Sequence, residues 1–387
     1  MAVKSLSHNS EAALIKTEQP ILGTVLSVQA NFYWVRLDST TENYCLSIDK
    51  ATTSSNQHVP QQLLCTRRSR LKKMGQQVWV GDRVRIAEPD WNSQRGAIIE
   101  VFPRTSELDR PPVANADHIL LVFAMANPPL EPLQLSRFLV KAESTQLAVT
   151  LCLNKRDLVP QDEQQEWCNR LQKWGYSPIL VSLHHRLGLD ALTNHLKGHH
   201  TIISGPSGVG KSSLINYLIP SVDQRVNSVS GKLGRGRHTT RHVELFELPE
   251  GGLVADTPGF NQPELDCYPN QLSQYFPEIH QQLAQHTCQF SNCLHRDEPN
   301  CAVRGDWERY EHYLSMLDDA ISYQTEQDQR TAKETAMKIK SGQKGHDRVE
   351  PKLRTKRYRR KSRRSETQNL QDFCGNVQEM LSYEADD

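Results

Sequence analysis

Eight residues near the middle of the chain have the types and spacing of a phosphate-binding loop. The stretch GPSGVGKS, residues 205–212, fits G-x-x-x-x-G-K-[ST] and stands between a strand-like TIIS and a helix-like SLINYL. Glycines let backbone N–H groups approach phosphate oxygens, and a helix N-terminus favours their charge. Lys211 is expected to reach the terminal phosphates, and the Ser212 hydroxyl is placed for Mg²⁺. The predicted nucleotide contacts here are Gly205, Pro206, Ser207, Gly208, Val209, Gly210, Lys211, Ser212 and Ser213.

A second short motif, NKRD, follows the strand-like AVTLCL about fifty residues upstream of that loop. The Asp157 carboxylate can accept two hydrogen bonds from guanine, from N1–H and the exocyclic amine, a pair that adenine does not offer. Asn154 can hydrogen-bond to the other edge of the base, and the aliphatic stem of Lys155 can lie across the ring. Arg156, between Lys155 and Asp157, belongs to the same predicted nucleotide-binding set. Ser182, after ILV, could supply the small loop that touches the guanine carbonyl. Four residues alone also fit an ordinary strand-end turn, but a phosphate loop in the same domain favours a guanine reader.

A third motif, ADTPG at residues 255–259, ends another strand-like run. Asp256 is expected to hold Mg²⁺ through water, and the Gly259 N–H to reach a γ-phosphate. The glycine-rich, basic stretch ahead of it suggests a mobile switch loop in which a threonine completes the Mg²⁺ shell. We favour Thr240 over Thr239, with a surface hydroxyl as the alternative for either.

The residue after this motif is unsuited to catalysis. Many GTPases place a water-orienting glutamine one position beyond the glycine, but this chain has Phe260, which can neither orient water nor accept a proton. Intrinsic hydrolysis should therefore be slow and accelerated by a partner. His238 could position or deprotonate the water, and an exposed loop histidine is the alternative.

Three cysteines and a histidine form a compact cluster in the C-terminal part of the chain. They follow the spacing C-x₄-C-x-H-x₅-C and could instead be buried thiols that are close by chance. Four such ligands within fourteen residues suit a closed tetrahedral Zn²⁺ site, so the predicted role is structural, with one ion per chain. The predicted ligands are Cys288, Cys293, His295 and Cys301.

The elements that must position these residues change in character along the chain. Short alternating strands from Ile21 to about Val101 predict a small β-barrel, and the basic TRRSRLKK between two of them predicts a solvated loop or a nucleic-acid contact. A Pro-rich linker follows, and then strands alternate with helices, which is typical of a mostly parallel α/β sheet. Beyond about Pro263 the chain is helical and polar, and RYEHYLSMLDDAISYQ predicts an amphipathic helix beside the metal cluster.

Composition and charge narrow the class of protein. The net charge of +1 conceals a tail with thirteen Lys or Arg and two acidic residues over 338–364, followed by six acidic residues and no bases over 365–387. The basic run predicts salt-sensitive RNA contact, with a solubilising or inhibitory arm as the alternative. The longest strongly apolar run, ILLVFAMA, is too short to cross a bilayer, and clustered cysteines indicate a reducing compartment. We therefore expect a cytoplasmic protein without membrane contact.

The order of these motifs resembles the circularly permuted, ribosome-associated GTPases that mature the small ribosomal subunit. The resemblance covers about residues 21–310 and supports the same four zinc ligands; where that family often has a third threonine after HTT, this chain has Arg241. It implies a multidomain α/β protein: an OB-like β-barrel, a circularly permuted P-loop GTPase domain and a helical zinc-binding segment. The expected domains are an arm (1–20), the barrel (21–105), the GTPase domain (106–265), the zinc segment (266–335) and a basic then acidic disordered tail (336–387).

The resemblance implies a monomeric GTP hydrolase that binds GTP or GDP with Mg²⁺, contacts ribosomal RNA and is stimulated by the small subunit. The alternative is an RNA-binding scaffold that holds GTP and hydrolyses it incidentally, which Phe260 keeps open. An ATP-dependent kinase with the same phosphate loop is a third class, and the NKRD motif argues against it.

Overall fold

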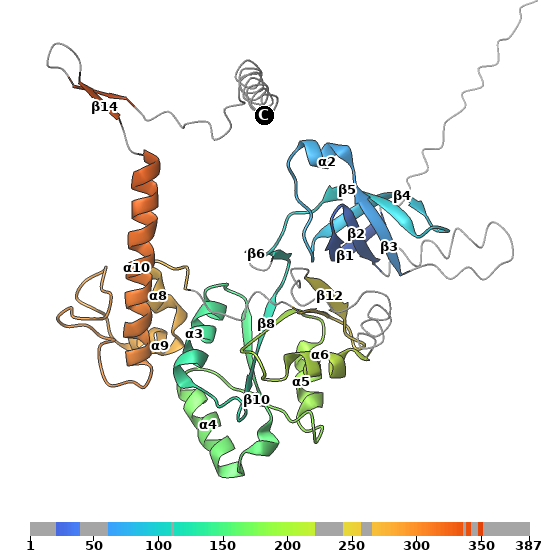
Figure 1. Ribbon diagram of the computed structural model, residues 1–387. Coiled ribbons are helices and arrows are strands. Elements are labelled where there is room, and N and C mark those ends of the chain that lie inside the picture. The colour runs from blue at the N-terminus through green and yellow to red at the C-terminus, as the bar shows by residue number, and fades with distance from the viewer. Residues whose placement is uncertain are drawn as a thin grey trace, which may run out of the picture. The chain divides into compact units, whose positions relative to one another are not determined.

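The structure, a computed structural model, describes residues 21–38, 61–109, 112–220, 243–256, 265–335, 338–341 and 347–350 (Figure 1). The chain divides into two compact units, residues 1–324 and 325–387. The predicted N-terminal arm and residues 39–60 of the predicted barrel lie outside the described residues.

Five strands near the N-terminus close into a barrel. Their order is β1-β2-β3-β5-β4, and β4 pairs back with β1. Alternate residues point inward, as the period of two requires, and the core contains Val25, Val35, Leu63 and Ile98, all fully buried. The predicted OB-like barrel is therefore confirmed. The strands are β1 (Ile21–Gln29), β2 (Phe32–Leu37), β3 (Gln62–Arg67), β4 (Arg83–Asp90) and β5 (Arg95–Val101).

The basic stretch predicted as a loop is partly helical. After β3 the chain forms the short helix α2 (Ser69–Lys73), whose Leu71 is buried against the barrel core. Burial of this one apolar side chain fixes the turn, and Arg70, Lys72 and Lys73 remain exposed.

Six further strands form the α/β part of the first unit, in the sheet order β10-β9-β8-β11-β13-β12. All pairs among them are parallel except β12 with β13. The predicted α/β alternation is confirmed. The strands are β8 (His118–Ala124), β9 (Ala148–Asn154), β10 (Ile179–Leu180), β11 (His200–Ser204), β12 (Glu244–Glu247) and β13 (Leu253–Asp256).

Helices cover both faces of this sheet. Strand β8 is buried throughout, and its side chains alternate between two cores: Ile119 and Phe123 join one, Leu120 and Val122 the other. A strand buried on both faces reads as one continuous apolar run, which is why HILLVFA shows no alternation. The first core includes α3 (Pro132–Glu143) and α4 (Gln161–Lys173), and the second includes α5 (Leu189–Leu196) and α6 (Lys211–Leu218).

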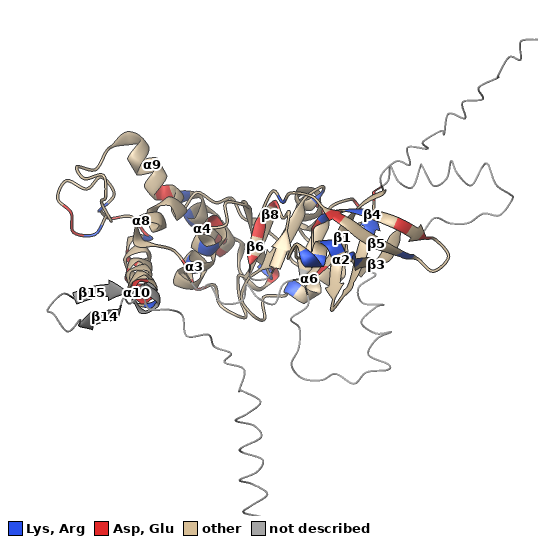
Figure 2. Cartoon of the chain, turned by 90° about the horizontal axis from the view of Figure 1, so that it is seen from above, with Lys and Arg blue, Asp and Glu red and all other residues tan. Residues whose placement is uncertain are grey.

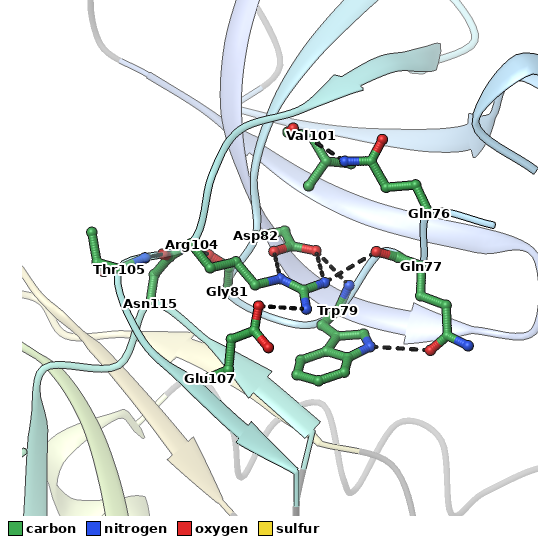
Figure 3. Close-up of polar contacts among 10 residues, drawn as sticks. All are labelled: Gln76, Gln77, Trp79, Gly81, Asp82, Val101, Arg104, Thr105, Glu107 and Asn115. Carbon is green, nitrogen blue, oxygen red and sulfur yellow. Dashed lines mark hydrogen bonds and ion pairs between the residues drawn. The ribbon is translucent and has the colours of Figure 1, made fainter. Parts of the chain in front are cut away.

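The Pro-rich linker between barrel and sheet is ordered around one buried carboxylate. It contains the short hairpin β6 (Glu107–Asp109) and β7 (Pro112–Ala114). Figure 3 shows Arg104 bonded to Asp82 beside the Trp79 ring. The Arg104 Nε and Nη2 atoms donate to Asp82, which is fully buried, at 2.7 and 3.0 Å, and the guanidinium carbon lies 3.9 Å from the Trp79 ring centre. This bidentate pair ties the linker to the barrel.

The C-terminal segment of the first unit is helical, as predicted. It contains α8 (Pro269–Leu272), η3 (Ser273–Tyr275), α9 (Pro277–Gln285) and most of α10 (Tyr310–Thr335). These elements share a core with Val140 of α3, built mainly from Phe276, Tyr313 and Leu317. No helix among the described residues is long and apolar enough to cross a membrane.

The second unit differs from the predicted disordered tail at two short strands. Strands β14 (Lys338–Ser341) and β15 (Asp347–Glu350) pair antiparallel. Their register places Lys338 opposite Glu350 and Ile339 opposite Val349. Residues 351–387, which include most of the basic run and all of the acidic run, lie outside the described residues.

Candidate functional site

The phosphate loop joins the end of β11 to the start of α6. Gly205 has φ +140°, and a Cβ atom there would lie 2.0 Å from the Val122 carbonyl oxygen. Gly210 has φ +99°, and a Cβ atom there would lie 2.5 Å from the Asn154 amide nitrogen. Both positions therefore require glycine, for the backbone conformation and for the close approach of neighbouring strand ends.

The charged end of Lys211 lies at this loop. Its Nζ atom donates to the carbonyl oxygens of Gly205 and Pro206, both at 2.6 Å. Ser212 and Ser213 are exposed on the first turn of α6. The ammonium group, the loop N–H groups and two hydroxyls thus gather at one helix N-terminus, which suits a polyphosphate.

The NKRD motif lies at the same edge of the sheet, although it comes earlier in the chain. Strand β8 separates β9 from β11, and both strands run parallel to it. The Asn154 amide donates to the Val209 carbonyl at 2.9 Å, and Lys155 Nζ donates to the Gly208 carbonyl at 2.9 Å. Asn154 and Lys155 therefore hold the phosphate loop directly. Sequence reasoning assigned them only to the base and missed this contact.

The third residue of the motif has a different neighbour. Arg156 Nε donates to Gln164 Oε1 of α4 at 3.1 Å, and the Gln164 amide donates back to the Arg156 carbonyl at 2.8 Å. These two hydrogen bonds hold the turn after β9 against α4. They thereby support the next residue, Asp157, which is exposed.

Asp157 is exposed beside the loop after β10. A hydrogen bond from the Ser182 hydroxyl lowers the pKa of its carboxyl group, so the carboxylate form is favoured. Ser182 is fully buried, and its hydroxyl also accepts from the His185 N–H at 3.1 Å. The side chain of Ser182 thus orients Asp157, a role that the sequence did not indicate.

Two histidines lie at this position that sequence reasoning missed. His184 and His185 offer ring nitrogens within 4.8 Å of an Asp157 oxygen, and all three side chains are exposed. The two histidines are adjacent in the loop closed by the Ser182–Leu187 bridge. In the sequence, only their position shortly after Ser182 could have indicated that they lie near Asp157.

The residues predicted at the Mg²⁺ side are only partly described. Asp256 is the last residue of β13, and its backbone pairs with Ile203, two residues before Gly205. This register places Asp256 beside the start of the phosphate loop. His238, Thr240, Gly259 and Phe260 lie outside the described residues.

The predicted metal ligands converge in the C-terminal segment. The His295 Nδ1 atom lies 3.6 Å from Cys288 Sγ and 3.4 Å from Cys301 Sγ, and the two sulfurs are 4.0 Å apart. Ligand atoms of Cys288, Cys293, His295 and Cys301 all lie within 4.8 Å of one another. A tetrahedral zinc ion with bonds of about 2.3 Å to sulfur and 2.0 Å to nitrogen needs separations of roughly 3.5 to 3.8 Å. The donor set and its spacing fit such an ion.

Backbone and aromatic groups support this cluster. The backbone N–H groups of Val303 and Arg304 donate to Cys301 Sγ, at 3.4 and 3.3 Å. Burial lowers the pKa of His295, which favours the neutral imidazole that binds metals. Tyr313 of α10 donates to the Leu294 carbonyl at 2.7 Å and thereby fixes the loop against the helix.

Comparison with known proteins decides the family. The family model for the RsgA GTPase matches residues 101–266. The small ribosomal subunit biogenesis GTPase RsgA of Trichormus variabilis is 58% identical over 361 residues, covering 92% of this chain and 98% of that relative. This chain belongs to the RsgA GTPase family. The mitochondrial RsgA 1 of Arabidopsis thaliana, a more distant member, is 41% identical over 390 residues, covering 94% of this chain and 88% of its own.

Solved structures of similar proteins agree with membership of the RsgA family. YjeQ from Thermotoga maritima matches with a TM-score of 0.62 and 29% identity, over 78% of this chain and 99% of its own. YloQ, described as a circularly permuted GTPase, matches with a TM-score of 0.61 and 29% identity, over 82% and 98%. The predicted fold class and the predicted family are therefore confirmed, and the chain is a GTP-hydrolysing enzyme.

In this RsgA family member a buried arginine attaches the segment with the Cys₃His cluster to the GTPase helices. Arg309 is fully buried, and its Nη1 atom donates to both Glu278 oxygens at 3.1 and 3.0 Å. Its Nε atom donates to the Ser136 hydroxyl of α3 at 3.1 Å. The guanidinium also lies 4.9 Å from the Trp174 ring centre. The segment is thus fixed to the helical layer beside α3.

Proposed function

We propose that this chain hydrolyses GTP in the late maturation of the small ribosomal subunit, binds ribosomal RNA and is stimulated by the subunit. The observation that carries the proposal is the contact of Asn154 and Lys155, three and two residues before Asp157, with the loop that holds Lys211. That arrangement joins a guanine reader to a phosphate site. The relatives named as small ribosomal subunit biogenesis GTPases supply the biological context.

In this proposal the loop residues 205–213 bind the phosphates, and Lys211 stabilises the charge that develops on the transferred group. Asp157, held by Ser182, reads the guanine base. Mg²⁺, which neutralises charge between the β- and γ-phosphates when bound, would be held by Ser212, Thr240 and Asp256, and Gly259 would contact the γ-phosphate. His238 would position the attacking water.

RNA contact is proposed for the barrel and the tail. Helix α2 presents Arg70, Lys72 and Lys73 on an exposed turn, together with Met74, which is 68% exposed (Figure 2). Such a cluster neutralises phosphates with salt-sensitive affinity. The basic run of the tail would add to it. The chain would act as a monomer, in the cytoplasm where ribosomes are assembled.

A second function rests on Phe260, which stands where many GTPases have a water-orienting glutamine. A chain that binds GTP and RNA but hydrolyses slowly would work as an assembly scaffold. Measuring GTP turnover with isolated small subunits, and with large subunits for comparison, separates the two functions, because only the first predicts specific stimulation.

The Cys₃His cluster is proposed to hold one structural Zn²⁺. Replacing Cys301 with serine is expected to remove the metal and unfold residues 286–303, because this segment has little other core. Metal analysis should give one zinc per wild-type chain and about none for the variant, and hydrogen exchange should rise in that segment. Cys168→Ser, which removes a half-buried thiol from α4, is the matched control. A Cys301→Ser chain that retains its zinc would contradict the assignment.

A further inference from the structure

Strand β12 belongs to two parts of the molecule at once. It pairs antiparallel with β13 of the GTPase sheet, and its first residue, Glu244, also pairs with Ser27 of the barrel strand β1. The barrel and the GTPase sheet are therefore hydrogen-bonded into one sheet of eleven strands.

The register of this junction leads directly to the nucleotide site. Ser27 pairs with Glu244, Glu244 pairs with Asp256, and Asp256 pairs with Ile203. One row of residues thus crosses from the barrel to the strand that ends at the phosphate loop. Asp256, the proposed Mg²⁺ residue, stands two strands from the barrel in that row.

A bulge in β1 inserts a barrel residue into the GTPase core. The pairing of β1 with β2 shifts register between Val25 and Ser27, which re-aims the side chain of Leu26. Val25 lies in the barrel core, but Leu26, only 6% exposed, lies in the GTPase core with Val243 and Leu245. The core on which β12 rests is therefore completed by the barrel.

An ion pair reinforces the junction at the other end of β12. Arg36 Nη1 of β2 lies 2.6 Å from Glu247 Oε1, and the two side chains are 27% and 38% exposed. An ion pair of this exposure contributes modestly to stability, but its length and position fix the register of β12 against the barrel.

We infer that Leu26, Arg36 and Glu247 are positioning residues for the Mg²⁺ side of the nucleotide site, acting through β12 on Asp256. The barrel then positions part of the nucleotide site in addition to its proposed contact with RNA. By thermodynamic reciprocity, a ligand that binds the barrel and changes the Mg²⁺ affinity is itself bound with an affinity that Mg²⁺ changes by the same factor. The inference rests on the proposed function, because it takes Asp256 as the Mg²⁺ residue.

Charge reversal and charge exchange at the ion pair test the inference. Glu247→Arg places like charges together, so the Mg²⁺ concentration for half-maximal GTP turnover should rise about threefold and kcat should fall similarly. GDP affinity measured without Mg²⁺ should stay unchanged, since the guanine and phosphate contacts lie elsewhere. The double variant Arg36→Glu/Glu247→Arg re-forms an ion pair of opposite charges, so it should restore most of the Mg²⁺ dependence and of kcat. If the size or shape of the new side chains caused the loss, the double variant would not recover.

The matched control is Glu100→Arg, which places two arginines together where Arg85 of β4 and Glu100 of β5 form an ion pair at 3.2 Å. This pair belongs to the barrel and does not involve β12. The control variant should leave the Mg²⁺ dependence unchanged. Leu26→Ala tests the junction without charges and should raise the required Mg²⁺ about tenfold, because it opens the shared core. If the Arg36 and Glu247 variants keep wild-type Mg²⁺ dependence, or if the double variant restores nothing, the inference is wrong. A wild-type chain that hydrolyses no GTP, with or without small subunits, would instead contradict the proposed function.

Discussion

Replacing Lys211 with alanine is expected to lower the GTP turnover number by about 100-fold or more. The Nζ atom of Lys211 lies 2.6 Å from the carbonyl oxygens of Gly205 and Pro206, inside the loop that the proposal assigns to the phosphates. The Lys211 ammonium stabilises the negative charge that develops on the transferred phosphoryl group in the transition state. The substitution removes this stabilisation. The loss should therefore appear mainly in kcat, measured by phosphate release at saturating GTP.

The control for this variant is Lys197→Ala, which removes an exposed lysine at the end of α5. It should leave turnover at the wild-type value. A Lys211→Ala chain that is folded and hydrolyses GTP at the wild-type rate would contradict the assignment of the loop as the reaction site.

The second large effect is expected for base specificity. Asp157→Asn should weaken GTP binding by about 100-fold or more and transfer the preference to xanthosine nucleotides, because a site built to accept two hydrogen bonds rejects a base that no longer matches it. Xanthine presents a carbonyl where guanine has its amine, so the amide introduced by this substitution can donate to it. The Ser182 hydroxyl can still donate to the amide oxygen, which keeps the side chain oriented.

Competition between labelled GDP and unlabelled GTP, XTP and ATP measures this change of preference. Asp162→Asn, at an exposed position in the first turn of α4, is the matched control and should keep the preference for GTP. An Asp157→Asn chain that still prefers GTP over XTP would show that another group reads the base.

Much of this site could be predicted because its residues are fixed by local chemistry. Gly205 and Gly210 are needed for backbone geometry, so their spacing is visible in the sequence. The four proposed metal ligands lie within fourteen residues, so their proximity follows from the short chain between them. The alternation of strands and helices can likewise be predicted, because burial imposes a characteristic spacing of apolar residues on each kind of element.

The rest depends on contacts between distant segments, which no local pattern encodes. The bond from Asn154 to Val209 spans 55 residues, and the pair of Arg36 with Glu247 spans 211. The bulge that directs Leu26 into the GTPase core looks like an ordinary strand position in the sequence. The sequence predicts a loop where helix α2 stands, because its basic residues outweigh a single buried leucine.

The most direct test of the proposed function is the GTP hydrolysis rate of the purified chain, alone and with isolated small ribosomal subunits, with large subunits and the Lys211→Ala variant as controls. The account predicts slow hydrolysis by the chain alone and a rise of roughly tenfold or more with small subunits only, about 1.4 kcal/mol in the barrier. Tight GTP binding with no rise in rate would contradict it and leave the scaffold function in its place.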